Sequence, residues 1–137
     1  MDNKLINITL ILADHATAEN GKLFILGGGW DRLNGGGPYS FTVAALAEIA
    51  VDSAPVDISG ELTVMDPNGQ IITGPDKKPI RIPLNIQATK PDDPTYTGWI
   101  QMPLVFRLDG LALNPGRYSI GLALGEFASS KNFIVVN

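Results

Sequence analysis

The chain has 137 residues, no cysteine, one histidine and a formal net charge of −4 at pH 7. This length suits one domain with a single hydrophobic core, and the lack of cysteine excludes disulfides, thiolate nucleophiles and thiolate metal sites. The lone His15 excludes multi-histidine metal sites, and ten scattered basic residues in an acidic chain argue against nucleic-acid binding.

The first predicted element is a strand over residues 4–15, whose two faces are both partly apolar. Such a strand is expected inside a sheet rather than at its edge. The same stretch resembles the core of a signal peptide, but its apolar run is short and is interrupted by Asn7 and Thr9. We therefore expect no secretion signal, and no stretch approaches the roughly 18 apolar residues of a transmembrane segment.

Asn20-Gly21 favours a tight hairpin turn into a second strand over residues 22–26. A third strand is expected at 39–49, with a helix over residues 44–50 as the alternative. Residues 56–65 alternate most regularly, so one face of that strand should meet the core and the other water. Further strands are expected at residues 70–73, 80–86, 96–108, 117–124 and 127–136.

About eight strands with frequent turns predict an all-β protein, an antiparallel β-sandwich of immunoglobulin-like or C2-like type over residues 1–137. A small closed β-barrel is the alternative. Pro83 cannot donate to a ladder and suggests an edge or a bulge in its strand. Residues 113–118 resemble the last hairpin of many such sandwiches, and we expect the Tyr118 hydroxyl to anchor a corner there.

Two runs of three glycines are the most informative feature of the chain. Neither run has the spacing, the lysine or the following helix of a nucleotide-binding loop. They are consistent with a phosphate cradle, with a bulge and a mobile loop, or with bare backbone where another protein approaches and Trp30 acts as an anchor. The predicted partner-contact residues are Gly27, Gly28, Gly29, Trp30, Asn34, Gly35, Gly36 and Gly37. The loops at residues 74–79 and 90–94 form a second candidate surface.

Little in the sequence indicates catalysis or metal binding. Asp14 and His15 are adjacent on a predicted strand, so they point to opposite faces, and a nucleophile such as Ser40 or Ser130 would have to be supplied by the fold. Several loop carboxylates could gather into a calcium site, but none has the spacing of a calcium-binding loop, and solvated turn residues explain them more simply. These carboxylates are Asp66, Asp76, Asp92, Asp93 and Asp109. We predict no catalytic residue, no metal site and no cofactor.

The chain resembles, over nearly its full length, an uncharacterised family of small β-sandwich proteins from actinobacteria and their bacteriophages. The segments that carry the resemblance are Ala13-Asp-His-Ala16, Gly21-Lys-Leu-Phe-Ile-Leu-Gly-Gly-Gly-Trp30, Val64-Met-Asp-Pro-Asn-Gly69, Gly74-Pro-Asp76 and Leu113-Asn-Pro-Gly-Arg-Tyr118. No catalytic motif accompanies the resemblance. It implies a virion component for phage members and an intracellular binding module for bacterial members.

We therefore expect a non-enzymatic structural or interaction protein, most concretely a capsid decoration or accessory protein, in the virion or the cytoplasm. Its partner is expected to be a capsid or other virion protein, or a second copy of the chain, and contact with it should bury Trp30. The alternative is a cytoplasmic ligand-binding module with a pocket between the sheets or a carboxylate cluster at the loop end. A hydrolase with His15 as base is the third hypothesis.

Overall fold

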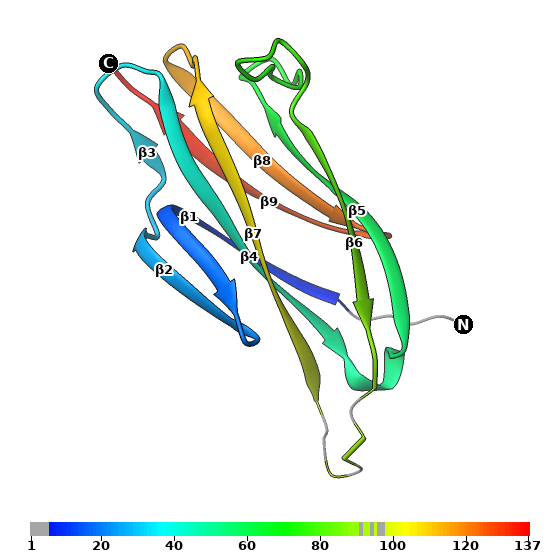
Figure 1. Ribbon diagram of the computed structural model, residues 1–137. Helices are drawn as coiled ribbons and strands as arrows, with labels where there is room; N and C mark the ends of the chain where they lie inside the picture. Colours follow the sequence, from blue (N-terminus) through cyan, green and yellow to red (C-terminus); the bar gives the residue numbers. More distant parts are fainter. Residues whose placement is uncertain (1–5, 91, 94, 96–97) are drawn as a thin grey trace.

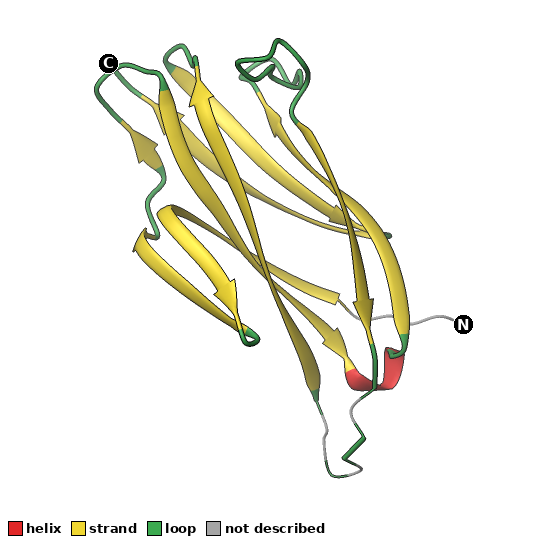
Figure 2. Cartoon of the chain, in the orientation of Figure 1, coloured by secondary structure: helices red, strands yellow, loops and turns green. Residues whose placement is uncertain are grey.

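The computed structural model describes residues 6–90, 92–93, 95 and 98–137. Strands dominate it, and one short 3-10 turn, η1 (Val51–Ser53), interrupts them. The strands are β1 (Ile6–Glu19), β2 (Lys22–Gly28), β3 (Arg32–Leu33), β4 (Tyr39–Ala50), β5 (Val56–Met65), β6 (Arg81–Ala88), β7 (Trp99–Leu111), β8 (Gly116–Leu124) and β9 (Phe127–Val135). The all-β prediction is confirmed (Figure 2).

The strands form two sheets, which pack face to face (Figure 1). The first sheet has the order β2-β1-β4-β7, and the second has the order β3-β9-β8-β5-β6. Named strands pair antiparallel except β3 and β9, which run parallel. Through the described part of the chain the two sheets stay separate, so the antiparallel sandwich is confirmed and the closed-barrel alternative is wrong.

The observed strands decide one open alternative and differ from the predicted strands at several places. Residues 44–50 belong to β4, which excludes the helical alternative, and residues 70–73 make only isolated bridges to their neighbours. β1 continues four residues beyond its predicted end at residue 15, because β2 pairs with this extension. β3 was not predicted, since two residues carry no periodicity and the strand depends on pairing with the distant β9. The predicted start at residue 96 lies outside the described residues.

Alternating apolar side chains from both sheets fill the space between them. The largest fully buried side chains are Phe41, Phe133, Leu12, Ile49, Leu62, Leu111, Ile120, Leu122, Leu124, Val43, Val64 and Val135. Phe133 contacts two other aromatic rings of this core. Its ring centroid lies 5.6 Å from that of Phe41 in an edge-on arrangement and 5.4 Å from that of Tyr118 in a stacked arrangement. Aromatic pairs at such separations add to the free energy gained by burial alone.

Tyr118 closes a corner at the start of β8. Its hydroxyl donates a 2.9 Å hydrogen bond to the backbone carbonyl of Asn114, four residues earlier. Burial of the ring raises the pKa of Tyr118 above its ordinary value. The predicted tyrosine anchor is confirmed.

No helix in the described part of the chain is long and apolar enough to cross a bilayer.

Candidate functional site

The outer part of β1 and all of β2 form a two-stranded ribbon, which we call the arm and define as residues 14–28. β1 pairs with β4 from Ile6 to Ala13, and from Ala13 to Glu19 it pairs with β2. The turn at the tip has positive φ at Asn20 (52°) and Gly21 (72°), as a two-residue type I′ hairpin requires. The predicted Asn-Gly turn is confirmed.

The arm folds back over the outer face of the first sheet (Figure 1). Cα atoms of β2 come within 8 Å of Cα atoms of both β4 and β7. In the sheet order, however, β1 lies between β2 and β4, and both β1 and β4 lie between β2 and β7. By strand alternation the side chain of Ala44 points to the outer face of the first sheet, away from the core between the sheets. It is nevertheless fully buried. Ala13 and Ala16 are buried as well, outside the main core cluster. The arm therefore covers a second, small apolar patch.

Two glycines of the first run leave room for neighbouring side chains of the arm. Gly27 has φ of 62°, and a Cβ there would overlap the carboxylate of Asp14. A Cβ on Gly28 would lie 2.5 Å from Cγ2 of Ile25 and 3.5 Å from Cγ2 of Ile11. Both glycines thus let side chains of β1 and β2 lie directly against the backbone. The register between β1 and β2 is the same on both sides of Gly27, so the expected bulge is not seen at this point of the described ladder.

Arg107 on β7 fastens the base of the arm. Its Nη1 donates to the backbone carbonyl of Asp14 at 2.9 Å and to Oγ1 of Thr42 at 3.1 Å. Its Nε donates to Oδ1 of Asp109 at 2.9 Å. Arg107 was not predicted as part of a site, because a separation of 93 residues between donor and acceptor leaves no local signal in the sequence.

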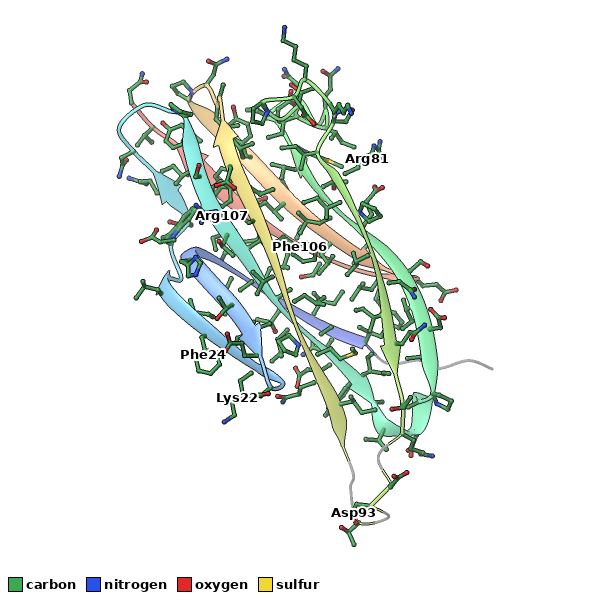
Figure 3. The ribbon with its side chains drawn as sticks, in the orientation of Figure 1. Lys22, Phe24, Arg81, Asp93, Phe106 and Arg107 are labelled. Atoms are coloured by element: carbon green, nitrogen blue, oxygen red, sulfur yellow. The ribbon has the colours of Figure 1, made fainter. Side chains whose placement is uncertain are left out.

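The arm exposes a run of large apolar side chains on β2. Phe24 is 53% exposed, Ile25 38% and Leu26 70%. We call these three residues the arm surface. Phe24 points away from the sandwich, and Lys22 lies near the tip (Figure 3). Residues 22–26 were predicted to be an ordinary strand, although the four consecutive apolar residues from Leu23 to Leu26, between a turn and a glycine run, do not fit a half-buried strand.

β2 also differs from the other sheet edges. The edge strand β7 carries Pro103, and the edge strand β3 has only two residues. The edge strand β6 carries Pro83, so of the two predicted positions, an edge or a bulge, the edge is the one observed. Proline at an edge lacks an N–H and discourages pairing with another strand. β2 has no proline and only one charged residue, Lys22. Among the edges in the described part of the chain, β2 is therefore the one best suited to accept another strand.

The structure places the predicted Trp30 against the core. Its ring lies 5.3 Å edge-on from Phe41, and its buried Nε1 has no hydrogen-bond acceptor among the described residues. The indole thus packs against a residue of its own chain, whereas a partner protein was expected to bury it. Gly29 and the loop with Asn34 are exposed. A Cβ added to Gly29, Gly35 or Gly36 would meet no atom within 4 Å. A Cβ added to Gly37 would lie 3.1 Å from the Tyr39 ring. Partner contact at these positions stays a prediction.

Among the described residues, no hydrogen bond joins His15 to Ser40 or Ser130, the residues considered for catalysis. His15 is exposed on the arm and pairs with Leu26, while Ser130 lies on β9 in the second sheet. Ser40 Oγ accepts a 3.0 Å hydrogen bond from the Gly110 N–H.

Asp66, Asp76 and Asp93 accept hydrogen bonds within their own turns, whereas Asp109, which was predicted on a loop, lies on β7 and pairs with Arg107. Asp66 Oδ1 accepts hydrogen bonds from the backbone N–H groups of Asn68 and Gln70, at 2.8 and 2.9 Å. Hydrogen bonds from the Thr95 hydroxyl and backbone N–H lower the pKa of Asp93. Among the described residues, no group of three or more His, Cys, Asp or Glu side chains could hold a metal ion.

Several hollows lie at the periphery of the sandwich. One of about 430 Å³ separates the edges of β6 and β7 and includes Arg81 and Arg107 in its walls. Another of about 340 Å³ lies near Asp57 and Phe127. The space between the sheets, where a ligand pocket was considered, is occupied by core side chains.

The fold and the arm define an antiparallel β-sandwich with an unprotected edge hairpin. The chain belongs to a family of unknown function (DUF6941), whose model matches residues 8–136. No curated protein matches the chain.

Two β-glucosidase structures are among the solved structures that share the fold. One is a β-glucosidase from Listeria innocua in complex with isofagomine, with 12% identity and a TM-score of 0.53. The other is a β-glucosidase structure from the same organism, with 10% identity and a TM-score of 0.51. Each match covers 97% of this chain and only 16% of the enzyme chain. Likeness at this identity shows the fold alone.

Proposed function

We propose that this chain is a non-enzymatic interaction protein that binds another protein chain through the arm surface and the free edge of β2. The observation that carries the proposal is the exposure of Phe24 and Leu26 on a sheet edge without proline. A strand edge of this kind pairs readily with an added strand, whose main-chain hydrogen bonds give affinity and whose side chains give specificity.

The energetics favour a contact at this place. Complete burial of a Phe or Leu side chain is worth roughly 1.5–3 kcal/mol, so Phe24 and Leu26 together offer a few kcal/mol to a partner that covers them. The hydrogen bond from Arg107 to Asp14 holds the arm against the sandwich. A held arm loses less conformational entropy on binding than a free one.

The specific form that we propose is a virion component, such as a capsid decoration or accessory protein. Its support is the resemblance of the sequence to proteins of actinobacterial phages, together with a surface suited to protein contact. A direct check is mass spectrometry of purified particles. Retention of the chain through a gradient purification supports this form, and its absence from the particles contradicts it.

Photo-crosslinking in the native cells tests the interaction itself. A photoreactive amino acid replaces Phe24, and in a control chain it replaces Ala128, which is exposed on the second sheet. We expect a protein adduct at position 24, identified by mass spectrometry, and none at position 128. Equal labelling at both positions, or no adduct at position 24, would overturn the proposal.

A further inference from the structure

We infer that Asn34 is a site of covalent self-modification, at which the side-chain amide is lost and a carboxylate takes its place. The reaction needs no partner, so the inference is independent of the proposed function. It is carried by the loop between β3 and β4 (Figure 1), where Gly35 follows Asn34, and by a comparison with the two other Asn-Gly pairs of the chain, at Asn20 and Asn68.

The nucleophile of this reaction is the backbone nitrogen of the following residue. The Gly35 nitrogen loses its proton and attacks the side-chain amide carbon of Asn34, so a carbon–nitrogen bond forms and ammonia leaves. Water then opens the resulting five-membered imide. Attack on the side-chain carbonyl carbon gives aspartate, and attack on the backbone carbonyl carbon gives isoaspartate. Either route consumes one water and releases one ammonia, and no oxidant or reductant takes part.

The nitrogen of Gly35 is open to this reaction. Gly35 has no Cβ to obstruct the approach, and a Cβ built there would meet no atom within 4 Å. Among the described residues, no hydrogen bond engages its N–H. The side chain of Asn34 is exposed, and within the described part of the chain it too makes no hydrogen bond. Both reacting groups can therefore approach each other.

Ring closure also requires a backbone rotation at the asparagine, because the next nitrogen has to turn toward the asparagine Cβ. The loop leaves room for this rotation, since Gly35 and Gly36 are both glycines with positive φ (93° and 71°) and lie outside the strands. β3 ends at Leu33, whose carbonyl accepts a 3.0 Å hydrogen bond from the Val136 N–H. The ladder thus ends before the bond that has to rotate.

Asn68 is also followed by glycine, but its backbone is held. The Gly69 N–H donates a hydrogen bond to the carbonyl of Asp66 at 2.9 Å, so the attacking nitrogen is engaged. The N–H groups of Asn68 and Gln70 both donate to Oδ1 of Asp66, at 2.8 and 2.9 Å. Rotation at Asn68 would break these bonds, so the reaction has to wait for local opening of the turn.

Asn20 is held by the turn at the tip of the arm. The φ values of Asn20 and Gly21, 52° and 72°, belong to a two-residue turn whose flanking residues Glu19 and Lys22 pair in the ladder. Moving the Gly21 nitrogen toward the Cβ of Asn20 would abandon this turn and open the pair. The same dipeptide therefore has three different backbone environments, and the one at Asn34 is the least restrained of them.

The modification changes the charge of the loop and leaves the core intact. It adds one negative charge to a chain of net charge −4, at a position predicted to contact a partner. Isoaspartate also lengthens the main chain by one carbon, beyond the end of β3 and before the start of β4. We therefore expect the modified chain to unfold at the same urea concentration as the unmodified chain.

Peptide mapping by mass spectrometry tests the site. The intact folded chain is incubated in mildly alkaline buffer, and fragmentation of its peptides locates each lost amide. We expect loss at Asn34 to be at least about tenfold faster than at Asn20 or Asn68, which corresponds to an opening free energy of about 1.4 kcal/mol at the two held turns. Loss at Asn34 that is no faster than at the other two positions would overturn the inference.

Two controls separate the effect of the fold from that of the local sequence. In guanidinium chloride the three Asn-Gly pairs should react at similar rates, because the turns no longer hold them. A preference for Asn34 that persists in the unfolded chain would overturn the structural explanation. In the folded chain, Asp66→Ala should speed the loss at Asn68 severalfold and leave Asn34 unchanged. An unchanged rate at Asn68 would contradict the protective role of its turn.

Discussion

Arg107 Nη1 on β7 donates a hydrogen bond of 2.9 Å to the backbone carbonyl of Asp14 on β1, across 93 residues of sequence. Asp14 follows Ala13, the last residue of β1 that pairs with β4, and from His15 onward β1 pairs with β2 alone. The bond therefore ties the base of the arm to the far edge strand of the same sheet. A charged donor makes it stronger than a neutral hydrogen bond.

Replacing Arg107 should loosen the arm more than the sandwich. We expect Arg107→Met to lower the free energy of unfolding by about 1–2 kcal/mol and to speed amide hydrogen exchange in residues 14–28. Arg81→Met is the matched control, because Arg81 pairs with Glu61 in the other sheet. Equal exchange in the arm of both variants would contradict this role for Arg107.

Gly27 should tolerate no side chain without cost. Gly27→Ala places a Cβ at φ of 62° and against the Asp14 carboxylate, so we expect a loss of about 2 kcal/mol in urea unfolding. Gly29→Ala meets only the cost of positive φ, since nothing lies within 4 Å, and should lose about 1 kcal/mol. Adding Asp14→Ala should bring the two losses closer. If the gap persists unchanged, the carboxylate contact is not its cause.

Trp30 carries a buried N–H without an acceptor among the described residues. An unsatisfied buried donor costs about 1–3 kcal/mol, so Trp30→Phe removes this cost while it keeps a ring against Phe41. We expect Trp30→Phe to lose under about 1 kcal/mol and Trp30→Ala about 3 kcal/mol, measured by circular dichroism in urea. Equal losses would show that the ring packing contributes little.

Tyr118 should make stability depend on alkaline pH. Burial raises the pKa of Tyr118 above 10.0, so the folded state keeps the proton to higher pH than the unfolded state. This contribution is fully present below about pH 10 and is lost as pH rises through the raised pKa. We expect the unfolding free energy of the wild type to fall more steeply above pH 10 than that of Tyr118→Phe. Parallel pH curves for the two proteins would contradict this.

Much of the fold follows from local patterns. The alternation in residues 56–65 predicted β5, and Asn20-Gly21 predicted the turn at the tip of the arm. Tyr118 was predicted to anchor a corner because its position after Asn-Pro-Gly is a local signal, and the hydroxyl does bond to Asn114. The candidate site was predicted only in part, since Gly27 and Gly28 lie in the arm while Phe24 and Leu26 were assigned to an ordinary strand.

The sequence by itself determined the class of the fold, several turns and the restriction of Pro83 to an edge or a bulge, because each depends on side-chain alternation, on φ preferences or on a missing N–H within a few residues. The tertiary structure decided that Trp30 packs on Phe41, that Arg107 holds Asp14, and that β2 folds back with its apolar residues exposed. Those contacts join residues far apart in the chain, and their free energy depends on which surfaces the folded sheets bring together.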